Sequence, residues 1–114
     1  MSDLRDRTKQ FALVIIRMFT ALPKSTEARV LGKQVLRSGT SVGANYREAY
    51  RSRSKAEFTA KIGDCLKELE ETVYWLELLV ESGIMTDKQL EPVRKECEEL
   101  IAIFVTSVKK SKSL

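Results

Sequence analysis

The chain has 114 residues, of which 43% are hydrophobic and 32% charged, with five glycines and two prolines. This length predicts one domain, residues 1–114, and the apolar content excludes an intrinsically disordered chain. No apolar stretch approaches the ~20 residues needed to cross a bilayer, and the N-terminus lacks the pattern of a secretory signal. We therefore expect a soluble, cytoplasmic protein with no membrane partner.

Histidine is absent from the sequence, which removes the most common general base and transition-metal ligand. Phosphate-binding glycine loops and paired-cysteine motifs are also missing. The two cysteines, Cys65 and Cys97, fall on apolar positions of expected helices and are predicted to be buried thiols. We predict no catalytic residue, no metal site and no cofactor, and hence a protein that is not an enzyme.

Apolar residues recur every three or four positions along nearly the whole chain, which is the period of an amphipathic helix. Pro23 ends the first such segment, and Ser25 or Thr26 is placed to cap the second. Ser54 and Glu57 form a capping box before the third, which stops at Gly83. Helices are predicted at about residues 3–22, 26–53, 55–82 and 87–110.

The second helix has one weak point, at residues 38–43, where glycines and β-branched residues lower helix propensity. This segment could instead form a kink, or a loop between two shorter helices. Residues 109–114 are predicted to fray. Short connections between long amphipathic helices favour an all-α fold, an antiparallel up-down-up-down four-helix bundle.

Charge is distributed unevenly along the chain. Residues 24–55 hold eight basic and two acidic groups, a net charge of +6, whereas residues 56–85 hold two basic and seven acidic groups, a net charge of −5. On a helical wheel, five cations of the second helix fall within an arc of about 80° beside the apolar face. This basic stripe consists of Arg29, Lys33, Arg37, Arg47 and Arg51.

Such a stripe suits the phosphate backbone of RNA, because each basic contact releases condensed counterions and arginine can hold phosphate through two hydrogen bonds. Two alternatives stay open. The cations could form a solvated face, or they could pair with carboxylates of the third helix such as Glu68, Glu71 and Glu77.

Gly32, Gly39 and Gly43 fall on one side of the second helix, next to its apolar face. Glycines in such a row allow another helix to pack closely, and we expect that partner to be the third helix or another subunit. Ser41 and Asn45 lie at the border of the apolar face. We expect them to form a capping or an interhelical hydrogen bond.

Three segments together resemble a known family: Ser41-Val-Gly-Ala-Asn-Tyr-Arg-Glu-Ala49, Lys55-Ala-Glu-Phe58 and Leu66-Lys-Glu-Leu-Glu-Glu-Thr-Val-Tyr-Trp-Leu-Glu-Leu-Leu79. They are similar to the four-helix-bundle proteins that include the 23S rRNA intervening-sequence proteins. A more distant likeness is to the accessory variability proteins of diversity-generating retroelements, which bind nucleic acid and reverse transcriptase.

The resemblance implies an antiparallel four-helix bundle that assembles into a ring-like homopentamer with no established enzymatic activity. It also implies a set of recurrent architectural or interface positions, with RNA contact as a second role. Besides Arg37, these positions are Gln34, Ser41, Asn45, Glu48, Tyr74 and Trp75.

Taken together, the patterns and the resemblance predict a non-enzymatic oligomeric scaffold. Its partner is predicted to be RNA, another polyanion or a nucleic-acid-processing protein, bound through the basic stripe. The alternative is a protein–protein interaction module with no nucleic-acid role.

Overall fold

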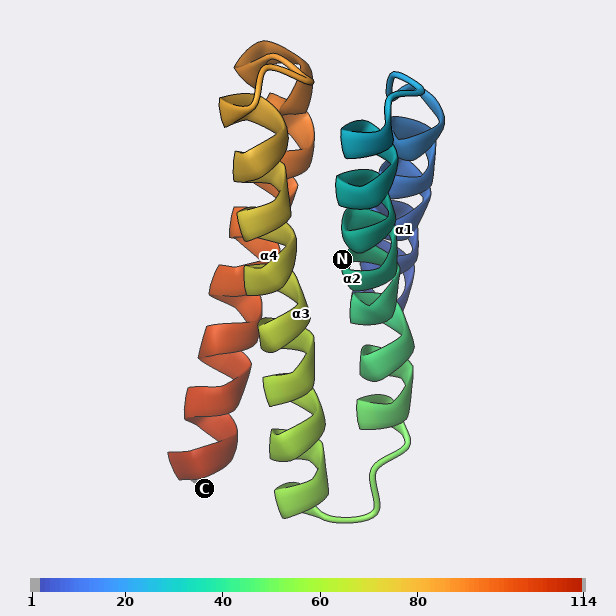
Figure 1. Ribbon diagram of the computed structural model, residues 1–114. Helices are drawn as coiled ribbons and strands as arrows, with labels where there is room; N and C mark the ends of the chain where they lie inside the picture. Colours follow the sequence, from blue (N-terminus) through green and yellow to red (C-terminus); the bar gives the residue numbers. More distant parts are fainter. Residues whose placement is uncertain (1–2, 114) are drawn as a thin grey trace.

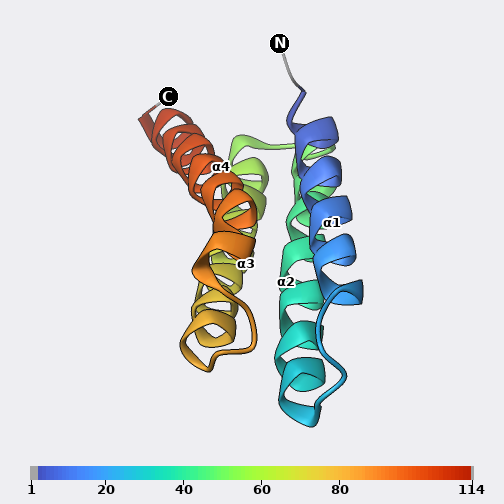
Figure 2. The same ribbon diagram turned by 90° about the horizontal axis from the view of Figure 1, so that it is seen from above.

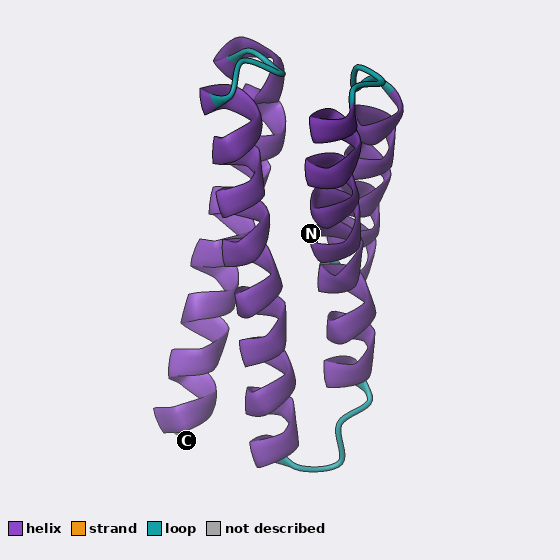
Figure 3. Ribbon diagram, viewed as in Figure 1, coloured by secondary structure: helices purple, strands orange, loops and turns teal. Residues whose placement is uncertain are grey.

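The computed structural model describes residues 3–113, the last of them by its backbone alone, and regular structure within that range is entirely α-helical. The elements are α1 (Leu4–Thr20), α2 (Thr26–Tyr50), α3 (Lys55–Glu81) and α4 (Asp87–Ser113), shown in Figure 1. Figure 3 shows that only short loops separate them. The predicted all-α fold of four helices is therefore confirmed.

The helices alternate in direction along a rod of 47 × 23 × 19 Å. The α1–α2 and α3–α4 turns lie at one end, and the α2–α3 loop lies at the other (Figure 1). Helix α2 packs along both α1 and α3, and α4 packs mainly on α3. Among the helix pairs in contact, α1 and α4 make the least contact, and Figure 2 shows α4 diverging from α1.

The predicted start and stop signals lie at the helix ends, although Glu57 does not return the second bond of the predicted capping box among the described residues. The Ser25 hydroxyl accepts a hydrogen bond from the Ala28 amide, and the Ser54 hydroxyl accepts one from the Glu57 amide. These bonds satisfy amides that the first turn of a helix leaves without intrahelical partners. Gly83, with φ of 81°, follows the last residues of α3 in a left-handed conformation that suits glycine.

Helix α2 is continuous through residues 38–43, so the alternative of a loop between two shorter helices is wrong. The hydroxyls of Thr40 and Ser41 donate to the carbonyls of Leu36 and Arg37, at 2.7 and 2.6 Å, and stay within the helix. Packing of the buried Gly39 against α1 offsets its low intrinsic propensity.

Helix α4 extends to Ser113, so residues 109–113 are helical and the prediction of fraying was wrong for them. Leu114 lies outside the described residues. Residues 109–113 stay helical because this end of α4 contacts the start of α3, where the buried Ser111 hydroxyl forms a hydrogen bond with the hydroxyl of Thr59. This bond fixes the last turns of α4 against α3.

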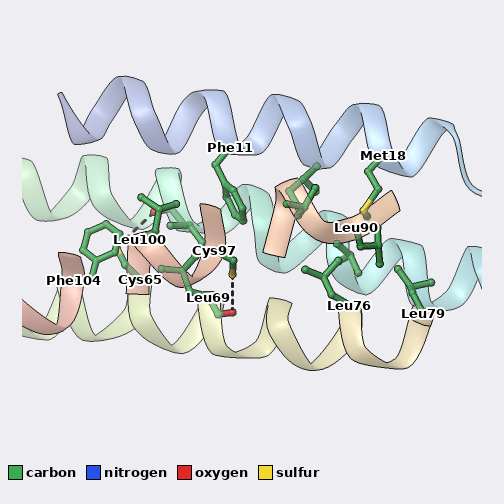
Figure 4. Packing of buried hydrophobic residues seen from close by; sticks show 14 of the residues in the cluster. Phe11, Met18, Cys65, Leu69, Leu76, Leu79, Leu90, Cys97, Leu100 and Phe104 are labelled. Carbon is green, nitrogen blue, oxygen red and sulfur yellow. Dashed lines mark hydrogen bonds between the residues drawn. The ribbon is translucent and has the colours of Figure 1, made fainter. Parts of the chain in front are cut away.

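The core consists of apolar side chains from all four helices, many of which Figure 4 shows. The thiols of Cys65 and Cys97 lie inside it and donate to the carbonyls of Val42 and Leu69, at 3.6 and 3.5 Å. Burial raises the pKa of each thiol to about 12. Both cysteines are free and buried, so the prediction of buried thiols is confirmed.

The glycine row of α2 packs against α1, and not against α3 or another subunit as predicted. A Cβ atom added to Gly39 would lie 2.8 Å from Cγ1 of Ile15, and one added to Gly32 would lie 2.5 Å from Cδ1 of Leu22. The short α1–α2 turn holds these helices as antiparallel neighbours, and α1 presents its bulky side chains opposite the glycines.

Candidate nucleic-acid interface

All five cations of the predicted stripe are exposed, four on α2 and Arg51 directly after its last residue, but Arg37 differs from the other four. Its guanidinium reaches α3, where it contacts Glu71 and lies 3.5 Å from a carboxylate oxygen of Glu68. It also donates to the side-chain oxygen of Gln34, at 3.4 Å. For Arg37, pairing with the acidic third helix is therefore what the structure shows.

The other four cations form two pairs, each spaced by one helical turn: Arg29 with Lys33, and Arg47 with Arg51. The pairs share one side of α2 and are separated along its axis by about 27 Å, at 1.5 Å per residue. In the part of the chain that the structure describes, no carboxylate oxygen lies within 4.0 Å of these four side chains. Their charge is available to a ligand.

The neighbour of this side of α2 explains why its charges stay unpaired. Residues 1–23 hold four basic and two acidic groups, a net charge of +2, and the Asp3 carboxylate caps α1 by accepting from the Arg5 amide. Arg5 also places its guanidinium 4.9 Å from the centre of the Tyr50 ring, next in sequence to Arg51. Arg5 itself pairs with Asp3 at 3.6 Å. Within the described residues, α1 thus offers the stripe no carboxylate, whereas α3 offers Glu68 and Glu71 to Arg37 on the other side.

A hollow of about 380 Å³ lies beside the first cation pair, at the α1–α2 turn. Nothing in the sequence pattern marks it, because its walls come from two helices and the turn between them. Both apolar and cationic side chains contribute to its lining. The lining residues are Phe19, Thr20, Leu22, Pro23, Lys24, Ala28, Arg29 and Lys33.

The recurrent positions implied by the resemblance lie on the side of α2 that faces α3, next to the stripe to which Arg37 also belongs, and on α3 itself. Gln34 and Arg37 connect through Glu71 to Trp75, whose indole N–H donates to that carboxylate at 3.3 Å. The Tyr74 ring packs edge-on against Trp75, with 5.0 Å between ring centres. A polar network therefore crosses the seam between α2 and α3.

Three further recurrent positions continue along this seam. Glu48 pairs with Lys61 of α3 at 3.0 Å, and this hydrogen bond raises the pKa of Lys61. The expectation for Ser41 was wrong, since its hydroxyl donates to the Arg37 carbonyl within the same helix. Asn45 is half-buried and its side chain forms no hydrogen bond with any described residue, so the expected bond is missing there too.

Among the residues that the structure describes, no cluster of histidine, cysteine and carboxylate side chains is arranged to hold a metal ion. Within the same range, no helix has the length and apolarity needed to span a membrane. The chemistry that the described surface offers is electrostatic: exposed guanidinium and ammonium groups on one side of α2, and an ion-pair network on the other.

Fold and surface together define a small helical-bundle protein with segregated surface charge. The chain belongs to the 23S rRNA-intervening sequence protein family, whose sequence model matches residues 2–106. It is also similar to a crystal structure of a protein of unknown function from the S23 ribosomal protein family of Bacteroides thetaiotaomicron. That similarity has a TM-score of 0.87 and 37% identity, and it covers 94% of this chain and 99% of that chain. No curated protein matches the sequence.

Proposed function

We propose that this protein is a non-enzymatic, oligomeric scaffold of the cytoplasm that binds RNA through the exposed cations of α2. One observation carries the proposal: Arg29, Lys33, Arg47 and Arg51 share one side of the helix with no acidic partner among the described residues. The family description, which names an intervening sequence of 23S rRNA, makes RNA the polyanion of choice. Phosphate oxygens are the groups that such a surface binds best.

Salt dependence tests this function directly. Each phosphate contact releases counterions, so the logarithm of the binding constant falls with the logarithm of salt concentration by roughly one unit per contact. Replacing both Arg47 and Arg51 with alanine should weaken binding of a structured rRNA fragment and reduce that slope by about two units. Fluorescence anisotropy over a salt series measures both quantities.

A matched control uses two exposed lysines of α4. Replacing Lys88 and Lys95 with alanine removes the same amount of charge far from the stripe in sequence. This variant should keep the wild-type slope. An equal loss in both variants would show that only net charge matters, and an unchanged slope in the arginine variant would reject the stripe as the binding surface.

We propose in addition that copies of the chain associate through the seam between α2 and α3, as the homopentamer of the resemblance implies. Tyr74 and Val30 are 53% and 57% exposed there, and the amide of Asn45 forms no hydrogen bond with a described residue. Apolar side chains in such positions become buried when a second surface covers them. The Asn45 amide, about 22 Å further along α2 than Val30, would find a partner if the neighbouring copy packs along that length of the helix.

Native mass spectrometry tests the assembly. Tyr74→Glu should convert a ring of copies into monomers, because a charge buried in an apolar contact is costly. Tyr50→Glu is the control, since Tyr50 is 60% exposed on the other side of α2 and should leave the assembly intact. A monomeric wild-type protein, or unchanged assembly in the Tyr74 variant, would contradict this interface.

The exposed Tyr74 also favours a second function, a protein–protein interaction module with no nucleic-acid role. If the partner were a nucleic-acid-processing protein, the chain would act near nucleic acid without binding it directly. Capture of one protein partner that resists high salt and is lost in Tyr74→Glu would support this module, particularly if the wild-type chain showed no salt-dependent affinity for RNA.

A further inference from the structure

The hollow at the α1–α2 turn combines two kinds of surface that a nucleotide requires. Phe19, Leu22 and Pro23 supply apolar surface, and Lys24, Arg29 and Lys33 supply cations. Its volume of about 380 Å³ lies at the lower end of the range for small-molecule sites, which suits a ligand of nucleotide size. Two of its cations belong to the proposed RNA-binding stripe.

The aromatic ring in the hollow is held in place by the contact between α1 and α2. A Cβ atom added to Gly32 would lie 3.1 Å from two carbons of the Phe19 ring, so the absence of a side chain at Gly32 makes room for that ring. Phe19 is only partly buried, and it lines the hollow. Such a ring can accept a base by stacking, which is tolerant of base identity.

The cations are placed to hold the phosphate of the same nucleotide. Arg29 and Lys33 are one turn apart on α2, and Lys24 lies in the turn just before it. No carboxylate oxygen among the described residues lies within 4.0 Å of these three side chains. The hollow also adjoins the N-terminal end of α2, where the helix dipole favours negative charge.

We infer that this hollow holds one unpaired nucleotide of the bound RNA, with its base against Phe19 and its phosphate among Lys24, Arg29 and Lys33. The inference rests on the proposed RNA-binding function and makes it more specific. Bases in an uninterrupted duplex are stacked on one another and cannot enter such a hollow. The protein should therefore prefer RNA with a bulge, loop or end near the segment that contacts Arg47 and Arg51.

The test uses two RNA hairpins with the same number of phosphates. One carries a single bulged nucleotide, and the other carries an abasic ribose at that position. Because only the base differs, the salt slopes should match, while the abasic hairpin should bind about tenfold more weakly to the wild-type protein. Fluorescence anisotropy at one fixed salt concentration measures the ratio.

Phe19→Leu tests the stacking surface, because leucine keeps the residue apolar but removes the ring. The tenfold ratio between the two hairpins should shrink to about onefold to twofold in this variant. Circular dichroism checks that the variant folds.

Lys24→Ala, an exposed substitution in the turn, gives a second variant. It should weaken binding of the bulged hairpin by about threefold and flatten the salt slope by about one unit. Lys88→Ala, the control, should change neither the affinity nor the slope.

The outcomes separate the two proposals. If both hairpins bind equally, with a salt slope that depends on Arg47 and Arg51, the nucleotide site is wrong and RNA binding stands. If neither hairpin binds at any salt concentration, the proposed function fails first. NMR shifts of the Phe19 ring on addition of an acidic aromatic peptide, with none on addition of the bulged hairpin, would assign the hollow to a protein ligand and overturn the inference.

Discussion

Helix α2 meets its two neighbours in different ways. Against α1 the contact is tight and apolar, with Gly39 facing Ile15. Against α3 it includes polar pairs beside the apolar core: Ser38 and Thr72 share a buried hydrogen bond of 2.7 Å, and ion pairs join Arg37 and Glu48 to that helix. The same helix therefore uses close approach on one side and polar pairing on the other.

The two neighbours of α2 also differ in the charge that they present to it. Cations are neutralised only where the neighbouring helix presents carboxylates, as Glu71 does to Arg37. Residues 56–85 have a net charge of −5 and residues 1–23 a net charge of +2. The cations on the α1 side consequently have no carboxylate oxygen within 4.0 Å among the described residues.

The largest effect is expected at Gly39. Substitution with alanine should lower the free energy of unfolding by about 2 kcal/mol. Overpacking against three atoms of the buried Ile15 side chain, all within 3.1 Å of the new Cβ, costs about 3 kcal/mol, and removing glycine from a helix interior returns about 1 kcal/mol. Urea denaturation followed by circular dichroism gives the number.

Gly63 is the matched control for this substitution, because a Cβ atom there meets no other atom within 4 Å. Gly63→Ala should raise the free energy of unfolding by up to about 1 kcal/mol through helix propensity alone. If the two variants changed stability by the same amount and sign, close approach of α1 would not be the reason for the glycine row.

The Cys65 thiol, which donates to α2 across the polar contact, predicts a pH dependence. Its pKa is raised from 9.0 to about 12 by burial, so below pH 9 both the folded and the unfolded chain keep the proton. Between pH 9 and 12 only the unfolded chain loses it, and the free energy of unfolding falls by about 1.4 kcal/mol per pH unit for this thiol.

Comparison with Cys65→Ala isolates that contribution, because the lysines titrate alike in both proteins. The variant is expected to be less stable at pH 8 but to lose less stability on going to pH 11. Parallel stability curves for the two proteins over this range would show that Cys65 ionises equally in the folded and unfolded chains.

Periodicity and capping residues were enough to predict the helices, because each depends on local sequence. Ser54 and Gly83 lie at helix ends in the structure as in the prediction. What could not be predicted is which neighbour each side of α2 faces. The glycine row indicates close approach without naming the partner helix, and the hollow beside Arg29 requires two helices and a turn to be in place.

Charge counting shows the same division between local and non-local information. The acidic third helix was a correct candidate partner for the stripe, but only Arg37 is oriented to reach it. Arg29 lies on the same wheel, yet its angle around the helix places it on the α1 side. Whether a cation pairs with α3 therefore depends on a difference of about 80° in its position around the helix. The sequence predicts which position faces α3 only when the order of the helices in space is known.

A smaller effect is expected from the buried hydrogen bond on the α3 side. Thr72→Val removes one partner of Ser38 and should lower the free energy of unfolding by about 1 kcal/mol. Combining it with Ser38→Ala should cost less than the sum of the single substitutions, because each single substitution leaves the other buried hydroxyl only the bond within its own helix, to the carbonyl of Val35 or Glu68. Strictly additive losses would mean that the two hydroxyls do not depend on each other.

The smallest effect is also the most direct test of the contrast between the two sides of α2. Glu71→Gln keeps an oxygen for the Trp75 indole but removes the charge that holds Arg37. The freed guanidinium should raise RNA affinity by about threefold and steepen the salt slope by less than one unit, since Glu68 still lies near Arg37. Glu77→Gln, which removes the same charge from an exposed site on α3, should change affinity less. Equal gains in affinity from both variants would indicate that the overall negative charge of α3 weakens RNA binding, and not the ion pair between Glu71 and Arg37. The difference between the paired and the unpaired side of α2 would then not determine where RNA binds.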